Sequence, residues 1–212
     1  MTPTIRHVSR LLGVVLAALL PVLGTVSAAR ADTAVTYNLQ SSAAGQTATT
    51  TLSVQVTASA PSSVSAGAPF SIALSVGSIT VPTSASGYTV TKIQTIDLKI
   101  PVPSNSTYVS SSLAGGSNYG SGTPSVSQSA GVVDIAIPGP ISAGTTFTLP
   151  TLTLNLTAGS SGSIVTSTLS GTSYSAPGLT FTAVLSVFIF SINASTVGYP
   201  TTTPALTTTT IS

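Results

Sequence analysis

The chain has 212 residues with a formal net charge of +2, and only 4% of its residues are charged. Ordinary globular proteins have about 25% charged residues, but 42% of this chain is hydrophobic, so its low charge does not predict disorder. The sequence contains no basic patch, and this excludes nucleic-acid binding because neutralising phosphates needs several Lys or Arg residues. Because the chain has no cysteine, its core must be stable without disulfides.

Residues 1–31 are predicted to be a secretory signal peptide. Arg6 and Arg10 precede an apolar run over residues 11–26, and Ala29-Arg30-Ala31 places small residues at the −3 and −1 positions of a cleavage site. The alternative is a membrane anchor that stays on the mature protein. Cleavage would leave two Lys and three Asp, a net charge of −1. The protein is therefore expected to be secreted, extracellular or part of the cell envelope.

Alternation of apolar and polar residues predicts β-strands through most of residues 32–199, which we expect to form one domain. The predicted strands include residues 35–39, 49–57, 63–65, 70–76, 92–103, 107–112, 125–129, 132–137 and 163–169. Residues 92–103 show the pattern well and are predicted to form a middle strand. Ala130-Gly131 predicts a tight hairpin between two of the strands.

Residues 61–70 contain the pattern Pro–x–x–Val–x–x–Gly–x–x–Phe, formed by Pro61, Val64, Gly67 and Phe70. This pattern resembles the opening two strands of bacterial immunoglobulin-like sandwich modules. Residues 141–159 resemble the last third of such modules, where a Gly turn, a long alternating strand and a second Gly turn lead to a closing strand. The resemblance implies an all-β fold, an immunoglobulin-like β-sandwich.

The chain also resembles secreted actinobacterial proteins that are rich in Ser and Thr and poor in charge, a family without an established activity. Such proteins often carry a cysteine near each end of the chain. Leu39 and Gly198 stand at the corresponding places in this sequence, so no disulfide is expected there.

Gly178–Asn193 is the most apolar stretch after the predicted signal peptide. Its alternation is lost around Val187–Phe190, which predicts a central strand buried on both faces. Two alternatives remain: residues 181–192 face a bound apolar ligand, or they form a strand that faces lipid. The following residues, 200–212, are rich in Thr, contain two Pro, and are predicted to form a flexible, disordered tail.

The residue types that remain after the signal peptide limit the possible chemistry. Residues 32–212 contain no His, Cys, Glu, Arg, Trp or Met. Ser-His-Asp and Cys-His catalysis need a histidine base, and zinc and copper sites lose their usual ligands. No enzyme activity, cofactor or metal site is therefore predicted. We expect a non-catalytic structural or interaction protein of the cell envelope or extracellular space; the alternatives are a carrier of lipid or another apolar ligand, and a β protein associated with an envelope membrane.

Four residues are candidates for contact with a partner, which would be an unidentified protein, a glycan or an envelope component. Asp97 and Lys99 lie two residues apart and share one face of their strand, and Asp134 is predicted to reach Lys92 or Lys99 across strands. Tyr119 lies in a loop, residues 115–123, whose Tyr, Ser and Gly composition is typical of adaptable binding loops. The simpler interpretation is an exposed ion pair and a plain surface loop.

Overall fold

A computed structural model describes residues 28–212, whose regular secondary structure is entirely β. The all-β prediction is confirmed. The predicted signal peptide lies outside the described residues, apart from Ala28–Ala31, which begin the first strand. The strands are β1 (Ala28–Ala43), β2 (Gln46–Pro61), β3 (Ser63–Val64), β4 (Pro69–Val76), β5 (Ile79–Thr80), β6 (Ser84–Ala85), β7 (Tyr88–Pro101), β8 (Ser106–Ala114), β9 (Ser125–Ser129), β10 (Val132–Ile137), β11 (Ile141–Ser142), β12 (Thr146–Phe147), β13 (Thr151–Ala158), β14 (Ile164–Ser167), β15 (Leu179–Val187), β16 (Phe190–Pro200) and β17 (Thr207–Ile211).

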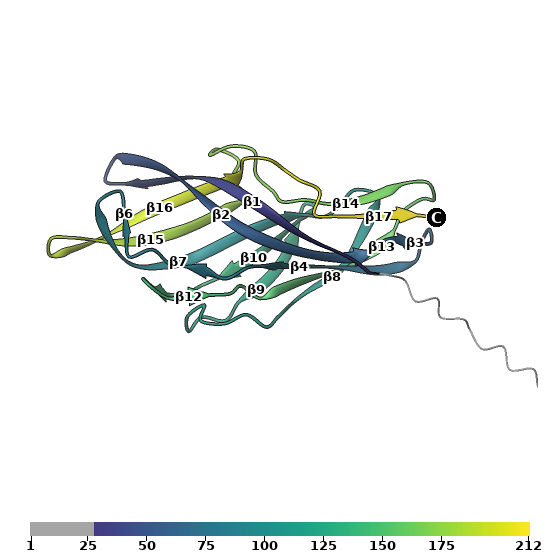
Figure 1. Cartoon of the computed structure of the whole chain (residues 1–212), viewed down its shortest axis with the longest axis horizontal. Helices are drawn as coiled ribbons and strands as arrows, with labels where there is room; N and C mark the ends of the chain where they lie inside the picture. Colours follow the sequence, from purple (N-terminus) through teal and green to yellow (C-terminus); the bar gives the residue numbers. More distant parts are fainter. Residues whose placement is uncertain (1–27) are drawn as a thin grey trace, which may run out of the picture.

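Twelve of the described strands form one antiparallel sheet in the order β8-β13-β4-β2-β1-β16-β15-β7-β10-β9, with β6 and β11 also paired to β7. The end strands β8 and β9 come close to each other, so the curved sheet is nearly closed around the core (Figure 1). Two small sheets, β12–β5 and β14–β17–β3, complete the described fold. An immunoglobulin-like sandwich has two separate packed sheets, and that finer prediction is not confirmed, because the main strands here are continuous in one sheet.

The long β1–β2 hairpin carries the sheet from one side of the molecule to the other. Near its base, residues 56–59 of β2 pair with β4, whereas nearer its tip, residues 37–42 of β1 pair with β16. The hairpin strands are 16 residues each, long enough to hold different neighbours at their two ends. This shared hairpin explains why the sheet does not divide into two.

Side chains alternate in burial along the strands, as their sequences predict. In β13 each second residue is buried, with Leu152, Leu154 and Leu156 at most 1% exposed. Each such burial contributes roughly 1.5–3 kcal/mol relative to exposure. The expected middle strand is confirmed as well, because β7 lies between β15 and β10 and buries Ile96 and Leu98.

Two irregularities in β7 change which of its residues face inward. Its register with β15 shifts between the partners of Thr180 and Thr182, and again between those of Val184 and Leu185. Thr95, at the first shift, has a φ of +52°. Bulges of this kind bend a strand and redirect side chains. As a result Val90, Ile93 and Ile96 all reach the interior, although they are three residues apart and would not share a face of a regular strand.

The predicted hairpin turn at Ala130-Gly131 is confirmed. It joins β9 to β10, and the φ angles of its two residues are +49° and +78°. Positive φ at both central positions is the requirement of a type I′ turn, which matches the twist of the flanking strands.

The prediction of a flexible tail over residues 200–212 is wrong for its last third. Thr207–Ile211 form β17, which pairs with β14 and, in parallel, with β3. Leu206 and Ile211 are each 1% exposed, and the Thr209 hydroxyl donates a 2.7 Å hydrogen bond to the Pro61 carbonyl. Composition misled here because alternate Thr side chains can fill a small interior when their hydroxyls find partners.

The prediction of one strand buried on both faces near Val187–Phe190 is also wrong. β15 ends at Val187, β16 begins at Phe190, and the two strands pair as a hairpin. Alternation is lost there because the chain turns, and the turn residues are exposed.

Leu39 and Gly198 are cross-strand partners in the β1–β16 pair. A Cβ atom at Gly198 would lie 2.5 Å from Leu39 Cδ2. The leucine side chain therefore fills the space that a side chain at position 198 would need, and the two strands pack closely without a covalent bond.

Candidate ligand-binding cavity

An apolar cavity of about 800 Å³ lies inside the curved sheet. Its lining includes exposed residues of the β1–β2 turn (Ala44 and Gln46) and of the β6–β7 turn (Ser86 and Tyr88), so the cavity opens there. These turns lie at the end of the molecule where the β15–β16 hairpin also projects (Figure 1). Its lining is mostly aliphatic and aromatic and includes Tyr37, Leu39, Leu52, Val54, Val56, Val76, Ile79, Val81, Val90, Ile93, Ile96, Leu98, Phe147, Leu149, Leu169, Leu179, Phe181, Ala183, Leu185, Val187, Ile192 and Ala194.

The period of the strands places these side chains. Odd-numbered residues of β1 and β15 face the cavity, as do even-numbered residues of β16. In β2 the even-numbered residues 52–56 face it, whereas residues 46–51, nearer the hairpin tip, all border it. The bulge near Thr95 adds Ile93 to this wall, because a regular strand continued from Leu98 and Ile96 would turn Gln94 inward and Ile93 outward. Neighbouring strands thus contribute one continuous apolar surface.

Several lining side chains are only partly buried, although they belong to the inner face. Leu52, Val54, Ile93, Phe181 and Leu185 pack against the core on one side and border the cavity on the other. Apolar side chains that border a void lose dispersion contacts there, and the loss grows with the volume of the void. A ligand that filled the cavity would restore those contacts.

The polar side chains in the cavity wall are uncharged, and most of them are Thr or Ser near the tip of the β1–β2 hairpin and the β6–β7 turn. Thr196 is 1% exposed, and its hydroxyl lies 2.8 Å from the Ser41 hydroxyl, so the two satisfy each other. Burial raises the pKa of the Tyr37 phenol, which therefore stays neutral in the wall. The lining residues include no Asp, Lys or Arg. Such a cavity favours an apolar ligand over a charged one.

Three of the four predicted contact residues come together away from this cavity. In the β7–β10 register Asp134 lies opposite Lys99, and Asp97 lies opposite Ala136. All three are partly buried on the face opposite Ile96, Leu98 and Ile100. Of the two lysines expected across from Asp134, Lys92 and Lys99, the register selects Lys99. However, the described residues show no ion pair within 4.0 Å between Asp134 and Lys99.

The carboxylates of Asp97 and Asp134 are only partly satisfied by hydrogen bonds on this face. One carboxylate oxygen of each, Oδ1, is buried without a hydrogen-bond partner among residues 28–212. Desolvation raises the pKa of Asp97, the charge of Asp134 raises it further, and Lys99 partly opposes both. The folded state therefore favours the protonated form of Asp97.

We expect Asp97→Asn to raise the melting temperature at pH 7. A carboxyl whose pKa is higher in the folded state stabilises the protein below its unfolded pKa, about 3.9, and loses that contribution as pH rises through the folded value. The gain from Asp97→Asn should therefore shrink as the pH falls toward 4. Thermal unfolding of both proteins between pH 4 and 8 measures this. As a comparison, Lys99→Met should lower the melting temperature at pH 7, because it removes the positive charge that partly offsets the burial of Asp97. If the gain from Asp97→Asn did not change with pH, the raised pKa of Asp97 in the folded protein would be contradicted.

Tyr119, the fourth predicted residue, is partly buried and packs against the core instead of projecting from its loop. The loop is held in place by a bridge between Ser117 and Thr148 and by a hydrogen bond from Gly122 N to the Gly139 carbonyl. Gly120 approaches the Pro140 backbone so closely that a Cβ would overlap it. These contacts hold the loop against the sheet.

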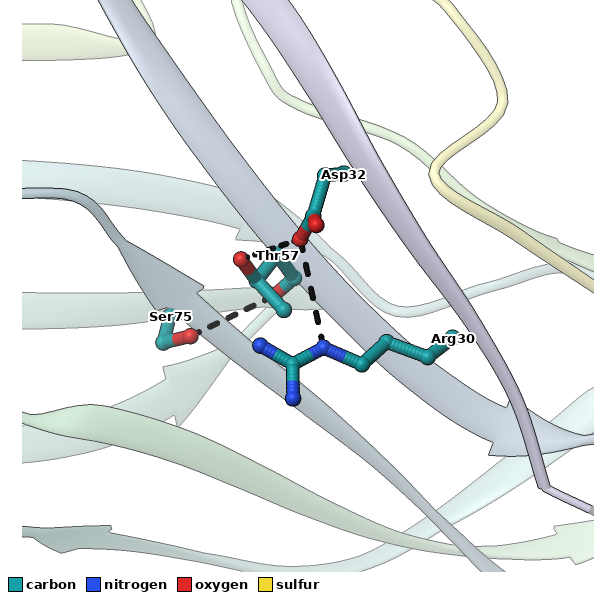
Figure 2. Close-up of polar contacts among 4 residues, drawn as sticks. All are labelled: Arg30, Asp32, Thr57 and Ser75. Atoms are coloured by element: carbon teal, nitrogen blue, oxygen red, sulfur yellow. Dashed lines mark hydrogen bonds and ion pairs between the residues drawn. The ribbon is translucent and has the colours of Figure 1, made fainter.

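A further polar group joins β1, β2 and β4 (Figure 2). Thr57 Oγ1 donates a 2.6 Å hydrogen bond to Asp32 Oδ1, Ser75 Oγ donates to the Thr57 carbonyl at 3.4 Å, and Arg30 Nε lies 4.0 Å from Asp32 Oδ1. The Arg30 and Asp32 side chains are 72% and 65% exposed, so the ion pair contributes at most about 1 kcal/mol. The group ties strands together and does not form a recessed site.

Residues 28–212 contain no group of three or more His, Cys, Asp or Glu side chains that could hold a metal ion. The same part of the chain has no helix of sufficient length and hydrophobicity to cross a membrane.

One solved structure resembles this fold. It is the crystal structure of a "Putative membrane anchored protein" from Corynebacterium diphtheriae, with a TM-score of 0.56 and 20% sequence identity. The match covers 86% of this chain and 38% of the corynebacterial chain, so this chain spans well under half the length of that protein. No protein-family model matches the chain, and neither does any curated protein sequence. At this level of identity the similarity concerns the fold.

The residue pattern does not locate the cavity. Contact with an apolar ligand was one of the alternatives for residues 181–192, and Phe181, Leu185 and Ile192 line the cavity. The other walls come from β1, β2 and β7, whose alternation is the same for a filled core and for a hollow one. The difference lies in how far apart the facing strands stand, and periodicity contains no signal for that distance.

Proposed function

We propose that this protein is a non-catalytic protein of the cell envelope that binds lipid or another apolar ligand. The observation that carries the proposal is the apolar cavity of about 800 Å³, whose lining has no charged residue. Cavities that hold small molecules have volumes of about 300–1,000 Å³ and mostly apolar linings with a few polar groups. The Ser41–Thr196 hydroxyl pair and the Tyr37 phenol could supply those polar groups.

Two further observations favour this function over others. The described residues have no His, Cys or Glu, so the cavity wall has none of the usual bases that activate a nucleophile. An envelope location is supported by the predicted signal peptide and by the name of the corynebacterial structural neighbour, which describes that protein as membrane anchored. Contact with a partner through Asp97, Lys99, Tyr119 and Asp134 has less support, because Tyr119 packs against the core.

A fluorescence titration with cis-parinaric acid, a long-chain fatty acid, tests the proposal. Its long hydrocarbon chain emits more strongly in apolar surroundings, and its carboxylate can stay in water at the open end of the cavity. We expect a saturable increase that oleic acid reverses by competition. At 100 times its dissociation constant a ligand stabilises the folded state by about 2.7 kcal/mol. In a domain of this size that corresponds to a melting temperature about 5–11 °C higher. No saturable signal, together with an unchanged melting temperature, would rule out fatty acids as the ligand class and leave a structural or interaction role.

A further inference from the structure

The tip of the β15–β16 hairpin consists of three exposed apolar side chains. Phe188, Ile189 and Phe190 are 97%, 88% and 68% exposed. Figure 1 shows this hairpin projecting from the end of the molecule that lies opposite the C-terminus. The tip residues do not line the cavity, but Val187 and Ile192, which flank them, do. The tip therefore stands at the rim of the cavity.

The turn at this tip holds a bulky residue where the backbone disfavours one. Val187 pairs with Phe190, so Phe188 and Ile189 form a two-residue turn, and Phe188 has a φ of +54°. Two-residue hairpin turns normally place Gly, Asn or Asp at positions with positive φ. No burial within residues 28–212 offsets this strain or the exposure of the ring. Strain of this kind at an exposed site points to a role outside the fold.

The rest of the rim is uncharged and adds one more aromatic residue. The β1–β2 turn at residues 43–46 and the β6–β7 segment at residues 84–88 contain only Ala, Gly, Ser, Gln and Tyr. Tyr88 is 49% exposed and lies beside β15, because the next residue, Thr89, pairs with Ser186. Tyrosine is enriched where membranes meet water, and uncharged polar residues enter the headgroup region at little cost. This combination suits the surface of a lipid bilayer.

We propose that the Phe188–Ile189–Phe190 tip inserts into the surface of a lipid bilayer and holds the mouth of the cavity against the membrane. An apolar ligand could then move between bilayer and cavity without crossing water, and this part of the inference rests on the function proposed above. Because the rim has no charge, binding depends on apolar burial and not on attraction to anionic lipids. It is therefore expected on zwitterionic vesicles and is expected to change little with salt.

A single-tryptophan experiment tests the insertion. The chain has no Trp, so Phe188→Trp gives the full-length protein one reporter at the tip. With phosphatidylcholine vesicles and no added ligand, we expect its emission to shift to shorter wavelength and to be lost when the lipid acyl chains are brominated. The matched control is Ile164→Trp, because Ile164 is 54% exposed on β14, near the opposite end (Figure 1). Its emission should not change.

Two results would overturn the insertion. One is an unchanged or equally quenched signal in Phe188→Trp and Ile164→Trp. The other is a blue shift in Phe188→Trp that grows with protein concentration without vesicles, together with a doubled mass in light scattering, because a second copy would then cover the tip. The cis-parinaric acid titration without vesicles separates the two proposals. If the protein binds cis-parinaric acid but Phe188→Trp does not insert into vesicles, only the docking of the tip on a bilayer is refuted. If Phe188→Trp inserts but the protein does not bind cis-parinaric acid, the docking is supported and the transfer of a ligand is refuted.

Discussion

Replacing Ala183 with Phe is expected to weaken the binding of cis-parinaric acid at least about tenfold, which corresponds to about 1.4 kcal/mol. Ala183 lies in the middle of β15, is paired with Ala194 on one side and Ile93 on the other, and all three residues line the cavity. The larger side chain would project into the volume that the ligand needs. The void would accept it without displacing a neighbour, since Ala183 itself is only partly buried.

The thermal unfolding of Ala183→Phe without ligand distinguishes blocked binding from misfolding. Filling an apolar void restores dispersion contacts, so the melting temperature should stay the same or rise. The control variant is Ala114→Phe, which adds the same side chain at an exposed position on β8 outside the cavity lining, and its affinity should equal that of the original protein. Unchanged affinity in a folded Ala183→Phe would place the ligand elsewhere and contradict the cavity as the binding site.

Ile211→Ala is expected to destabilise the protein by about 2–5 kcal/mol, although the residue is next to the last in the chain. Ile211 is 1% exposed and pairs with Val64 of β3 in the parallel ladder of the small sheet. The truncation removes buried carbon atoms and leaves a cavity against the core. For a domain of this size, the loss lowers the melting temperature by about 4–20 °C.

The control for Ile211→Ala is Thr208→Ala on the same strand. Thr208 is exposed, and surface substitutions usually change stability by no more than about 0.5 kcal/mol. Chemical unfolding of the three proteins measures both differences. If Ile211→Ala and Thr208→Ala were equally stable, β17 would contribute no core and the C-terminal residues would be a tail after all.

Local sequence predicted most of the strands because a half-buried strand has a repeat of two residues. The predicted strands at 125–129 and 132–137 have the same bounds in the structure, with the turn at Ala130-Gly131 between them. The sequence also narrowed the cross-strand partner of Asp134 to Lys92 or Lys99, and the register selects Lys99. These features depend on neighbours in the chain or on one adjacent strand, so composition and alternation are sufficient to predict them.

The errors have a common physical cause. At Phe188–Phe190 apolar side chains are exposed, and at Thr207 and Thr209 polar side chains are buried. Patterns of hydrophobicity assume the reverse in both cases. Thr207 is buried because its hydroxyl meets Ser167 Oγ at 2.7 Å, a partner 40 residues earlier in the chain. Such pairs cannot be found from the local sequence.

By itself, then, the sequence determined an all-β protein with a charge-poor surface and a core without disulfides. Only the tertiary structure decided that the strands form one nearly closed sheet, that this sheet encloses an apolar cavity, and that an apolar turn stands at the rim. The reason is that alternation specifies which side chains face inward, whereas the spacing of facing strands depends on pairings between residues far apart in the chain. The long β1–β2 hairpin sets that spacing here, because its two ends pair with different neighbours, β4 and β16.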